Sequence, residues 1–154
     1  MTGVQSCALP IFVVQFGPSD LLAIGDYPSL LDHKAPGSPE SKLIGGTLLE
    51  HKATAKAASP ITYVTKDDPP FLIIHGDKDM TVPYNQSERF AKALKEAGVD
   101  VLFIKVEGGG HGNFRNPEVP KRIRLFFDKH LRDQSVGTIS EEPIPVGEAT
   151  PKKQ

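Results

Sequence analysis

The sequence has no tryptophan and a single cysteine, Cys7, among its 154 residues. One cysteine excludes an intrachain disulfide framework and a metal site made of several thiolates. The formal net charge is −1, and basic residues cluster in groups no longer than adjacent pairs, which argues against a nucleic-acid partner. No apolar run is long enough to cross a bilayer, so the sequence predicts no membrane-spanning segment.

The chain is organised around residues 71–83, which begin with four apolar residues after Pro69 and Pro70. Such a run predicts a short strand that is buried on both faces of a parallel sheet. A polar turn with Asp77 and Asp79 follows, and a helix is expected to begin directly after it. In open α/β sheets, functional side chains stand on loops just beyond the carboxyl ends of strands, which makes both aspartates candidates.

A second apolar run, residues 101–106, ends in the same way. It leads into a glycine-rich loop, residues 108–112, that contains His111. An acid after one strand and a histidine after the next match the later part of a Ser, Asp, His order along the chain. The pattern predicts that one of the two aspartates, Asp77 or Asp79, lies at the same edge of the sheet as His111, near or within hydrogen-bond distance.

The rest of the chain alternates short apolar runs with helical periodicity, which predicts an α/β fold with parallel strands. A further strand is expected at residues 12–16, and helices are expected at residues 38–44, 48–58, 84–97 and 117–132. Residues 25–39 are rich in proline, glycine, serine and aspartate and predict a loop or small cap over the site. Residues 133–154 lack aromatic side chains and predict a disordered tail.

Residues 1–11 resemble, apart from Ser6, the translation of a common sequencing-adaptor oligonucleotide. We therefore interpret them as a foreign segment fused to the chain and exclude them from the fold. The alternative is a natural N-terminal strand that turns at Pro10. Under the first interpretation the true N-terminus is missing, and the sequence predicts no localisation.

Three segments resemble the C-terminal third of an α/β-hydrolase, namely residues 75–83 (HGDKDMTVP), 93–99 (ALKEAGV) and 110–112 (GHG). Residues 16–21 (FGPSDL) and 38–46 (SPESKLIGG) are similar to the esterase and lipase branch, which includes feruloyl and acetylxylan esterases. The prolyl-oligopeptidase type of hydrolase is the second choice.

The resemblance covers residues 12–132 and implies a partial α/β-hydrolase fold, with the last three parallel strands and their flanking helices. It implies that Asp79 is the acid and His111 the base of a Ser-Asp-His triad. The implied substrate is a carboxylic ester, either a small molecule or a group linked to a polysaccharide. The resemblance implies no cofactor.

The sequence departs from this family in one large respect, because it contains no Gly-x-Ser-x-Gly turn for a nucleophilic serine. The strands expected from the sequence are also fewer than a complete hydrolase sheet contains. We therefore expect a C-terminal piece of a serine hydrolase that supplies the acid and the histidine but lacks the nucleophile. Made alone, this piece is expected to be inactive.

Both site residues have competing interpretations. Asp77 is an alternative acid, but the resemblance places the acid three residues before Val82 and Pro83, at Asp79. Asp77 is then expected to bond backbone amides within the turn. Asp79 is alternatively a turn or N-cap aspartate, and His111 is alternatively a surface histidine of a glycine-rich loop.

The other histidines are expected to have supporting roles. His75 is expected to anchor the acid loop through hydrogen bonds rather than to perform chemistry. His33, His51 and His130 are expected to be solvated or structural. A metal bound at the two aspartates beside His75 is not favoured, because no further cluster of ligands supports a closed site. A complete, non-enzymatic α/β binding module is the third hypothesis, after the esterase and the peptidase.

Overall fold

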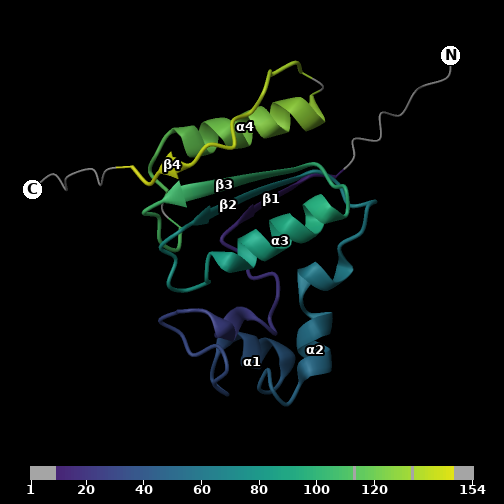
Figure 1. Cartoon of the computed structure of the whole chain (residues 1–154), viewed down its shortest axis with the longest axis vertical. Helices are drawn as coiled ribbons and strands as arrows, with labels where there is room; N and C mark the ends of the chain where they lie inside the picture. Colours follow the sequence, from purple (N-terminus) through teal and green to yellow (C-terminus); the bar gives the residue numbers. More distant parts are fainter. Residues whose placement is uncertain (1–9, 113, 133, 148–154) are drawn as a thin grey trace, which may run out of the picture.

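The computed structural model describes residues 10–112, 114–132 and 134–147, and its centre is a parallel sheet of four strands (Figure 1). In spatial order the strands are β1 (Phe12–Gln15), β2 (Phe71–Gly76), β3 (Val101–Glu107) and β4 (Ile144–Pro145). All three strands that the sequence predicts are present and parallel, which confirms that part of the expected fold. The sequence does not predict β4, which pairs with β3.

The central strand β2 is buried along its whole length, because strands flank it on both sides and helices cover both of its faces. Figure 1 shows α3 (Asn85–Glu96) on one face of the sheet and α4 (Glu118–Leu131) on the other. Both helices lie within one residue of their predicted limits. This sandwich gives the loops at the end of β2 a rigid base.

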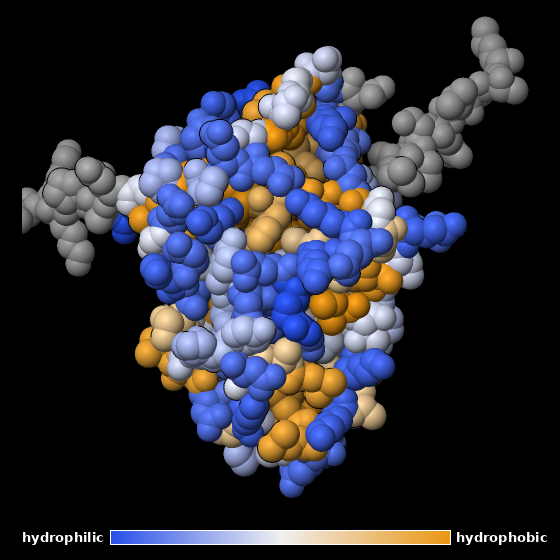
Figure 2. Space-filling view, viewed as in Figure 1, coloured by the Kyte–Doolittle hydropathy of each residue, from blue (hydrophilic) through white to orange (hydrophobic). Residues whose placement is uncertain are grey.

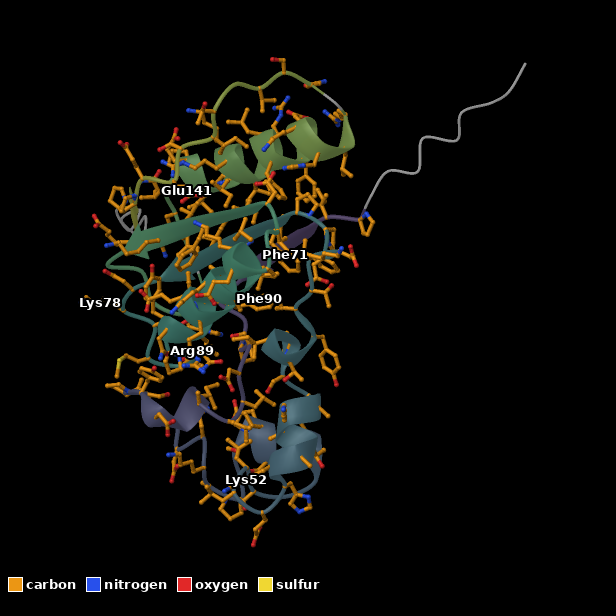
Figure 3. All side chains as sticks on the ribbon, turned by 45° about the vertical axis from the view of Figure 1, so that its right-hand side comes forward. Lys52, Phe71, Lys78, Arg89, Phe90 and Glu141 are labelled. Atoms are coloured by element: carbon orange, nitrogen blue, oxygen red, sulfur yellow. The ribbon has the colours of Figure 1, made fainter. Side chains whose placement is uncertain are left out.

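Successive side chains of β2 pack into the two layers in turn. Leu72 and Ile74 join the cluster on the side of α4, whereas Phe71 and Ile73 join the cluster on the side of α3. Phe71 and Phe90 of α3, which are labelled in Figure 3, pack edge to face, with ring centroids 5.5 Å apart. Burying a leucine or isoleucine side chain stabilises a fold by roughly 2 kcal/mol. The packing of β2 into both layers therefore holds the strand in place from both faces.

The polypeptide between β1 and β2 forms a small helical unit beside the sheet (Figure 1). It consists of η1 (Ile24–Asp26), α1 (Pro39–Ile44), α2 (Lys52–Ala57) and η2 (Pro60–Tyr63). The unit has its own core, made of Leu21, Ile24, Ile44, Leu48 and Ala55. Leu43 and Leu49 are nevertheless exposed on its surface. Figure 2 shows apolar patches over this part of the molecule.

Local side-chain hydrogen bonds decide where the helices of this unit begin. Ser38 caps α1, because its hydroxyl accepts a hydrogen bond from the amide of Ser41. The expected helix at residues 48–58 is shorter in the structure and begins at Lys52. The hydroxyl of Thr47 instead accepts a hydrogen bond from the amide of Glu50, which closes a turn before the helix.

The sequence predicts disorder from residue 133 onward, but residues 134–147 return to the sheet. They supply β4, which pairs with β3. Ile144 is almost fully buried in the cluster under α4, and Arg122 of α4 donates hydrogen bonds to two carbonyls of the tail. Pro143 and Pro145 fit an outer strand, because a proline there removes no ladder hydrogen bond that a central strand would need. Residues 133 and 148–154 of the expected tail lie outside the described residues.

Most of the segment interpreted as foreign, residues 1–9, also lies outside the described residues. Of its last two residues, Pro10 is exposed and Ile11 packs against the cluster on the side of α4. Within the ranges that the structure describes, no helix has the length and apolar character needed to span a bilayer.

Candidate active site

The loops that follow β2 and β3 meet at one edge of the sheet, because parallel neighbours end on the same side. Gly76 makes this approach possible, since a Cβ atom at that position would overlap the carbonyl group of Gly109. The amide of Lys78 donates a hydrogen bond of 2.9 Å to the carbonyl oxygen of Gly109. The acid loop and the glycine-rich loop therefore form one connected unit.

Asp77 joins these loops from the acid side. Its Oδ1 accepts a hydrogen bond of 2.7 Å from the amide of Gly108. The sequence predicts that Asp77 bonds amides within its own turn, and this is wrong in one respect, because the amide belongs to the neighbouring loop. The sheet brings the two loops together, and that contact is not visible in the local sequence. Asp77 thus supports the loop of His111.

Asp79 and His111 lie within hydrogen-bond distance, as the sequence predicts. The Nδ1 atom of His111 is 2.8 Å from Oδ2 of Asp79. The carboxylate is completely buried, whereas 37% of the His111 side chain is exposed. An ionised carboxylate only accepts hydrogen bonds, so Nδ1 carries the proton and Nε2 is left unprotonated in the neutral ring. The arrangement leaves a basic nitrogen on a partly exposed ring.

The remaining contacts of Asp79 keep its carboxyl group ionised. Oδ1 accepts hydrogen bonds from the amides of Thr81 and Val82, at 2.8 and 3.0 Å. Burial alone would raise the pKa of Asp79. The hydrogen bonds from His111 and from the two amides outweigh burial, so the pKa of Asp79 lies below its ordinary value of 3.8.

His75 lies behind Asp79 and anchors the acid loop, in agreement with its expected role. Its Nε2 atom is 3.0 Å from Oδ2 of Asp79 and 3.0 Å from the carbonyl oxygen of Val82. Its Nδ1 atom is 2.7 Å from the hydroxyl of Ser87 in α3. Burial lowers the pKa of His75 below 6.5, and the neighbouring Asp79 opposes this only in part.

Phe16 belongs to the site, although the sequence predicts it only as the last residue of a strand. The ring of Phe16 packs edge-on against His111, with centroids 4.7 Å apart, and also contacts Phe114. Its backbone has a φ of 44°, a left-handed conformation that is costly for an aromatic residue. Sequence carries one weak signal for this bend, the Gly17-Pro18 pair that ends the strand.

The other histidines are placed away from this edge. His33 is buried in the helical unit, where it lies 3.1 Å from Glu40 and 3.0 Å from the hydroxyl of Ser29. His51 is exposed just before α2, and His130 lies near the end of α4. No hydrogen bond joins any of the three to Asp79 or His111 within the described ranges.

A family model described as BD-FAE matches residues 2–94 of the chain. The chain belongs to the BD-FAE family. Esterase LipC of Mycobacterium tuberculosis is 35% identical over 102 residues, which are 62% of this chain and 25% of LipC. An uncharacterized peptidase of Bacillus subtilis, YuxL, is 30% identical over 79 residues, which are 47% of this chain and 12% of YuxL.

Among solved structures, a truncated form of a carbohydrate esterase from gut microbiota superimposes with a TM-score of 0.71 and 36% identity. The match covers 78% of this chain and 42% of that one. The fold of this BD-FAE member is therefore an α/β-hydrolase fold, and esterases are among its relatives. The chain spans about a quarter of the length of LipC and less than half of the carbohydrate esterase.

Proposed function

We propose that the protein to which this chain belongs hydrolyses carboxylic esters with a Ser-His-Asp triad, in which Asp79 is the acid and His111 the base. The observation that carries the proposal is the 2.8 Å contact between Nδ1 of His111 and the buried carboxylate of Asp79. This contact leaves the unprotonated Nε2 free to accept the proton of a serine hydroxyl. Both residues stand on loops after neighbouring parallel strands, where hydrolases of this fold carry them.

In this mechanism the serine attacks the ester carbonyl while its proton passes to Nε2 of His111. Collapse of the tetrahedral intermediate releases the alcohol, which takes the proton from His111, and leaves an acyl-enzyme. Water then attacks the acyl group and gives a proton to His111, and His111 returns that proton to the serine oxygen as the acid leaves. Asp79 stabilises the imidazolium that forms in both halves of the reaction.

The serine and the amides that bind the oxyanion are proposed to come from a part of the protein outside these residues. The sequence contains no Gly-x-Ser-x-Gly turn. Two serines near the sheet are engaged elsewhere, because Ser19 donates its hydroxyl to the carbonyl of Gln86 and Ser87 bonds His75. The chain by itself is therefore expected to lack activity.

The proposed substrates are small-molecule esters or ester groups linked to a carbohydrate. The similarity to an esterase and to a carbohydrate esterase supports this class. The choice between the two depends on residues that contact the acyl and alcohol groups. Esters of p-nitrophenol and acetylated xylan therefore make a suitable pair of first substrates.

The test is to join residues 12–154 to the upstream part of the gene and to assay the longer protein with p-nitrophenyl acetate. Asp79→Asn and His111→Ala should each lower kcat by about a thousandfold or more, as loss of a triad member does. Asp77→Asn is the matched control, because an asparagine still accepts the hydrogen bond from Gly108. Activity that survives His111→Ala would refute the proposal.

A peptidase of the prolyl-oligopeptidase type is the second candidate, supported by the 30% identity to the peptidase YuxL. The acid and the base would keep the same roles, and an amide nitrogen would replace the alcohol as leaving group. Parallel assays with an acylated amino-acid p-nitroanilide and a p-nitrophenyl ester separate the two. A higher kcat/KM for the anilide would favour the peptidase.

A further inference from the structure

Besides His111, the candidate site contains a buried imidazole that the Ser-His-Asp mechanism does not use. His75 is fully buried at the end of β2, and its Nε2 contacts the same carboxylate oxygen of Asp79 that His111 contacts. The two distances to Oδ2 are 3.0 Å from His75 and 2.8 Å from His111. One carboxylate oxygen thus contacts two imidazole rings.

The contacts of His75 determine which of its ring nitrogens carries the proton. The carbonyl of Val82 can only accept a hydrogen bond, and it lies 3.0 Å from Nε2, so Nε2 must be the donor. The same N–H also points to the ionised carboxylate of Asp79. In the neutral ring Nδ1 is then an acceptor, and the hydroxyl of Ser87 donates to it over 2.7 Å.

From this geometry we infer that His75 and Ser87 are positioning residues of the active site, which hold Oδ2 of Asp79 toward His111 through a Ser87–His75–Asp79 chain of hydrogen bonds. The inference rests on the proposed function, because it assigns His75 a task in orienting the acid of that triad. His75 touches neither the substrate nor the reacting atoms, so its effect is exerted through Asp79.

The buried carboxylate requires this second donor. An ionised carboxylate has about four acceptor positions, and a buried one that loses a partner is costly. Two amides fill Oδ1, and the two imidazoles fill Oδ2. The side chain of His111 is partly exposed, whereas His75 is fully buried and packed against Tyr84. The buried ring keeps the carboxylate in place during the cycle.

A neutral donor suits this position better than a charged one. When His111 becomes an imidazolium, a second positive charge on the far side of Asp79 would weaken the stabilisation that Asp79 offers. Burial and the positive charge of His111 both disfavour protonation of His75. Among the described residues, the charged group in hydrogen-bond contact with this ring is the carboxylate of Asp79, which His111 also contacts. The other titratable side chain against the ring is that of Tyr84.

The first test uses the 154-residue chain with ¹⁵N-labelled histidine and needs no activity. NMR should show His75 protonated at Nε2 and bare at Nδ1 between pH 8 and pH 6.5, because its pKa lies below the ordinary value of 6.5. A ring protonated at Nδ1, or one that becomes fully charged in this range, would overturn the inference directly.

The second test uses the longer, active protein with His75→Gln, His75→Leu and Ser87→Ala. His75→Leu should lower kcat by about 10- to 100-fold with little change in KM, the size of loss that a misplaced catalytic group causes. His75→Gln keeps an N–H donor and should recover most of kcat. His130→Gln is the control for a histidine outside the site.

The outcomes separate this inference from the proposed function. If the folded His75→Leu protein keeps full kcat while Asp79→Asn and His111→Ala are inactive, the positioning role is refuted and the triad stands. Full kcat in all three would refute the triad. If His75→Leu does not fold, the Ser87→Ala variant is used instead, because it removes only a hydroxyl group. A several-fold lower kcat of Ser87→Ala supports the positioning role, and an unchanged kcat contradicts it.

Discussion

At the scale of residues, Asp79 is the most heavily bonded side chain of the site although it is completely buried. It accepts two hydrogen bonds from backbone amides and two from imidazoles. Hydrogen bonds in such a poorly solvated place are strong, and a missing partner is correspondingly costly. The pKa values of both Asp79 and His75 lie below their ordinary values, which links the folding of the chain to pH.

The stability of the chain should fall in two stages as the solution is acidified. His75 binds a proton less readily in the folded state, so stability should decline below about pH 6.5, the ordinary pKa of histidine. Asp79 should add a second decline below about pH 3.8 for the same reason. Urea unfolding at a series of pH values measures both stages.

His75→Gln is the control for the first stage of this decline, because glutamine does not titrate. It should make the loss of stability between pH 6.5 and 5 smaller. Some loss should remain, since burial also lowers the pKa of His130. Stability that rises on acidification through this range would contradict the assignment.

At the scale of elements, the site depends on the close contact between the loops after β2 and β3. Gly76 sits at the point of closest approach, where the neighbouring atoms are backbone atoms of Gly109 and Gly110. Backbone atoms of a bonded loop cannot move aside cheaply, as the end of a flexible side chain could. The sheet register therefore places Asp79 beside His111 only if the residue at position 76 has no Cβ atom.

Gly76→Ala should destabilise the chain by about 2 kcal/mol, the cost of forcing an extra group into a packed site. It should also lengthen the contact between Asp79 and His111, because the two loops are pushed apart. Urea unfolding measures the first effect and the histidine NMR spectrum the second. Gly37→Ala is the matched control, since a Cβ atom there meets nothing within 4 Å and should change stability little.

The tail is the other element with a measurable contribution. Ile144→Ala should destabilise the chain by about 2–4 kcal/mol, because it leaves a cavity in the cluster under α4. Thr138→Ala, at an exposed position of the same tail, should have little effect and serves as the control. Equal unfolding midpoints for both variants would show that the tail does not stabilise the fold.

At the scale of the whole molecule, the chain is a member of the BD-FAE family with an α/β-hydrolase fold, and it spans only part of its relatives. β1 pairs only with β2 among the described residues, so its other side presents unpaired backbone groups. Phe12 of β1 and several leucines of the helical unit are exposed. An open strand edge next to apolar surface favours self-association.

The 154-residue chain, made as written, should hydrolyse p-nitrophenyl acetate no faster than its own His111→Ala variant. His111 can act only on a nucleophile that it contacts, and the proposed serine is not among these residues. Loss of the nucleophile removes several powers of ten in rate. Activity far above the variant would show that a serine of this chain is the nucleophile.

Restoring the upstream part of the gene should produce activity that depends on both Asp79 and His111. The longer protein should also be less prone to associate, because its additional residues would cover the edge of β1. Light scattering of the two proteins at equal concentration measures this difference.

The sequence by itself determined the strands at the centre of the fold and the two candidate site residues. Apolar runs between turn residues are a local signal, and helical periodicity with capping residues is another, so both can be read without a structure. The position of Asp79 and His111 after successive strands also follows from sequence order, because parallel strands end at the same edge.

Tertiary structure alone decided the contacts between segments that are distant in the chain. β4 depends on a long return of the tail, and its burial under α4 is not encoded in its own composition. Phe16 reaches His111 only because β1 lies beside β2, and Asp77 reaches Gly108 only because Gly76 allows the loops to touch. The contact of two imidazoles with one oxygen of Asp79 is also a tertiary contact. It forms only because the end of β2, the acid loop and the glycine-rich loop come together.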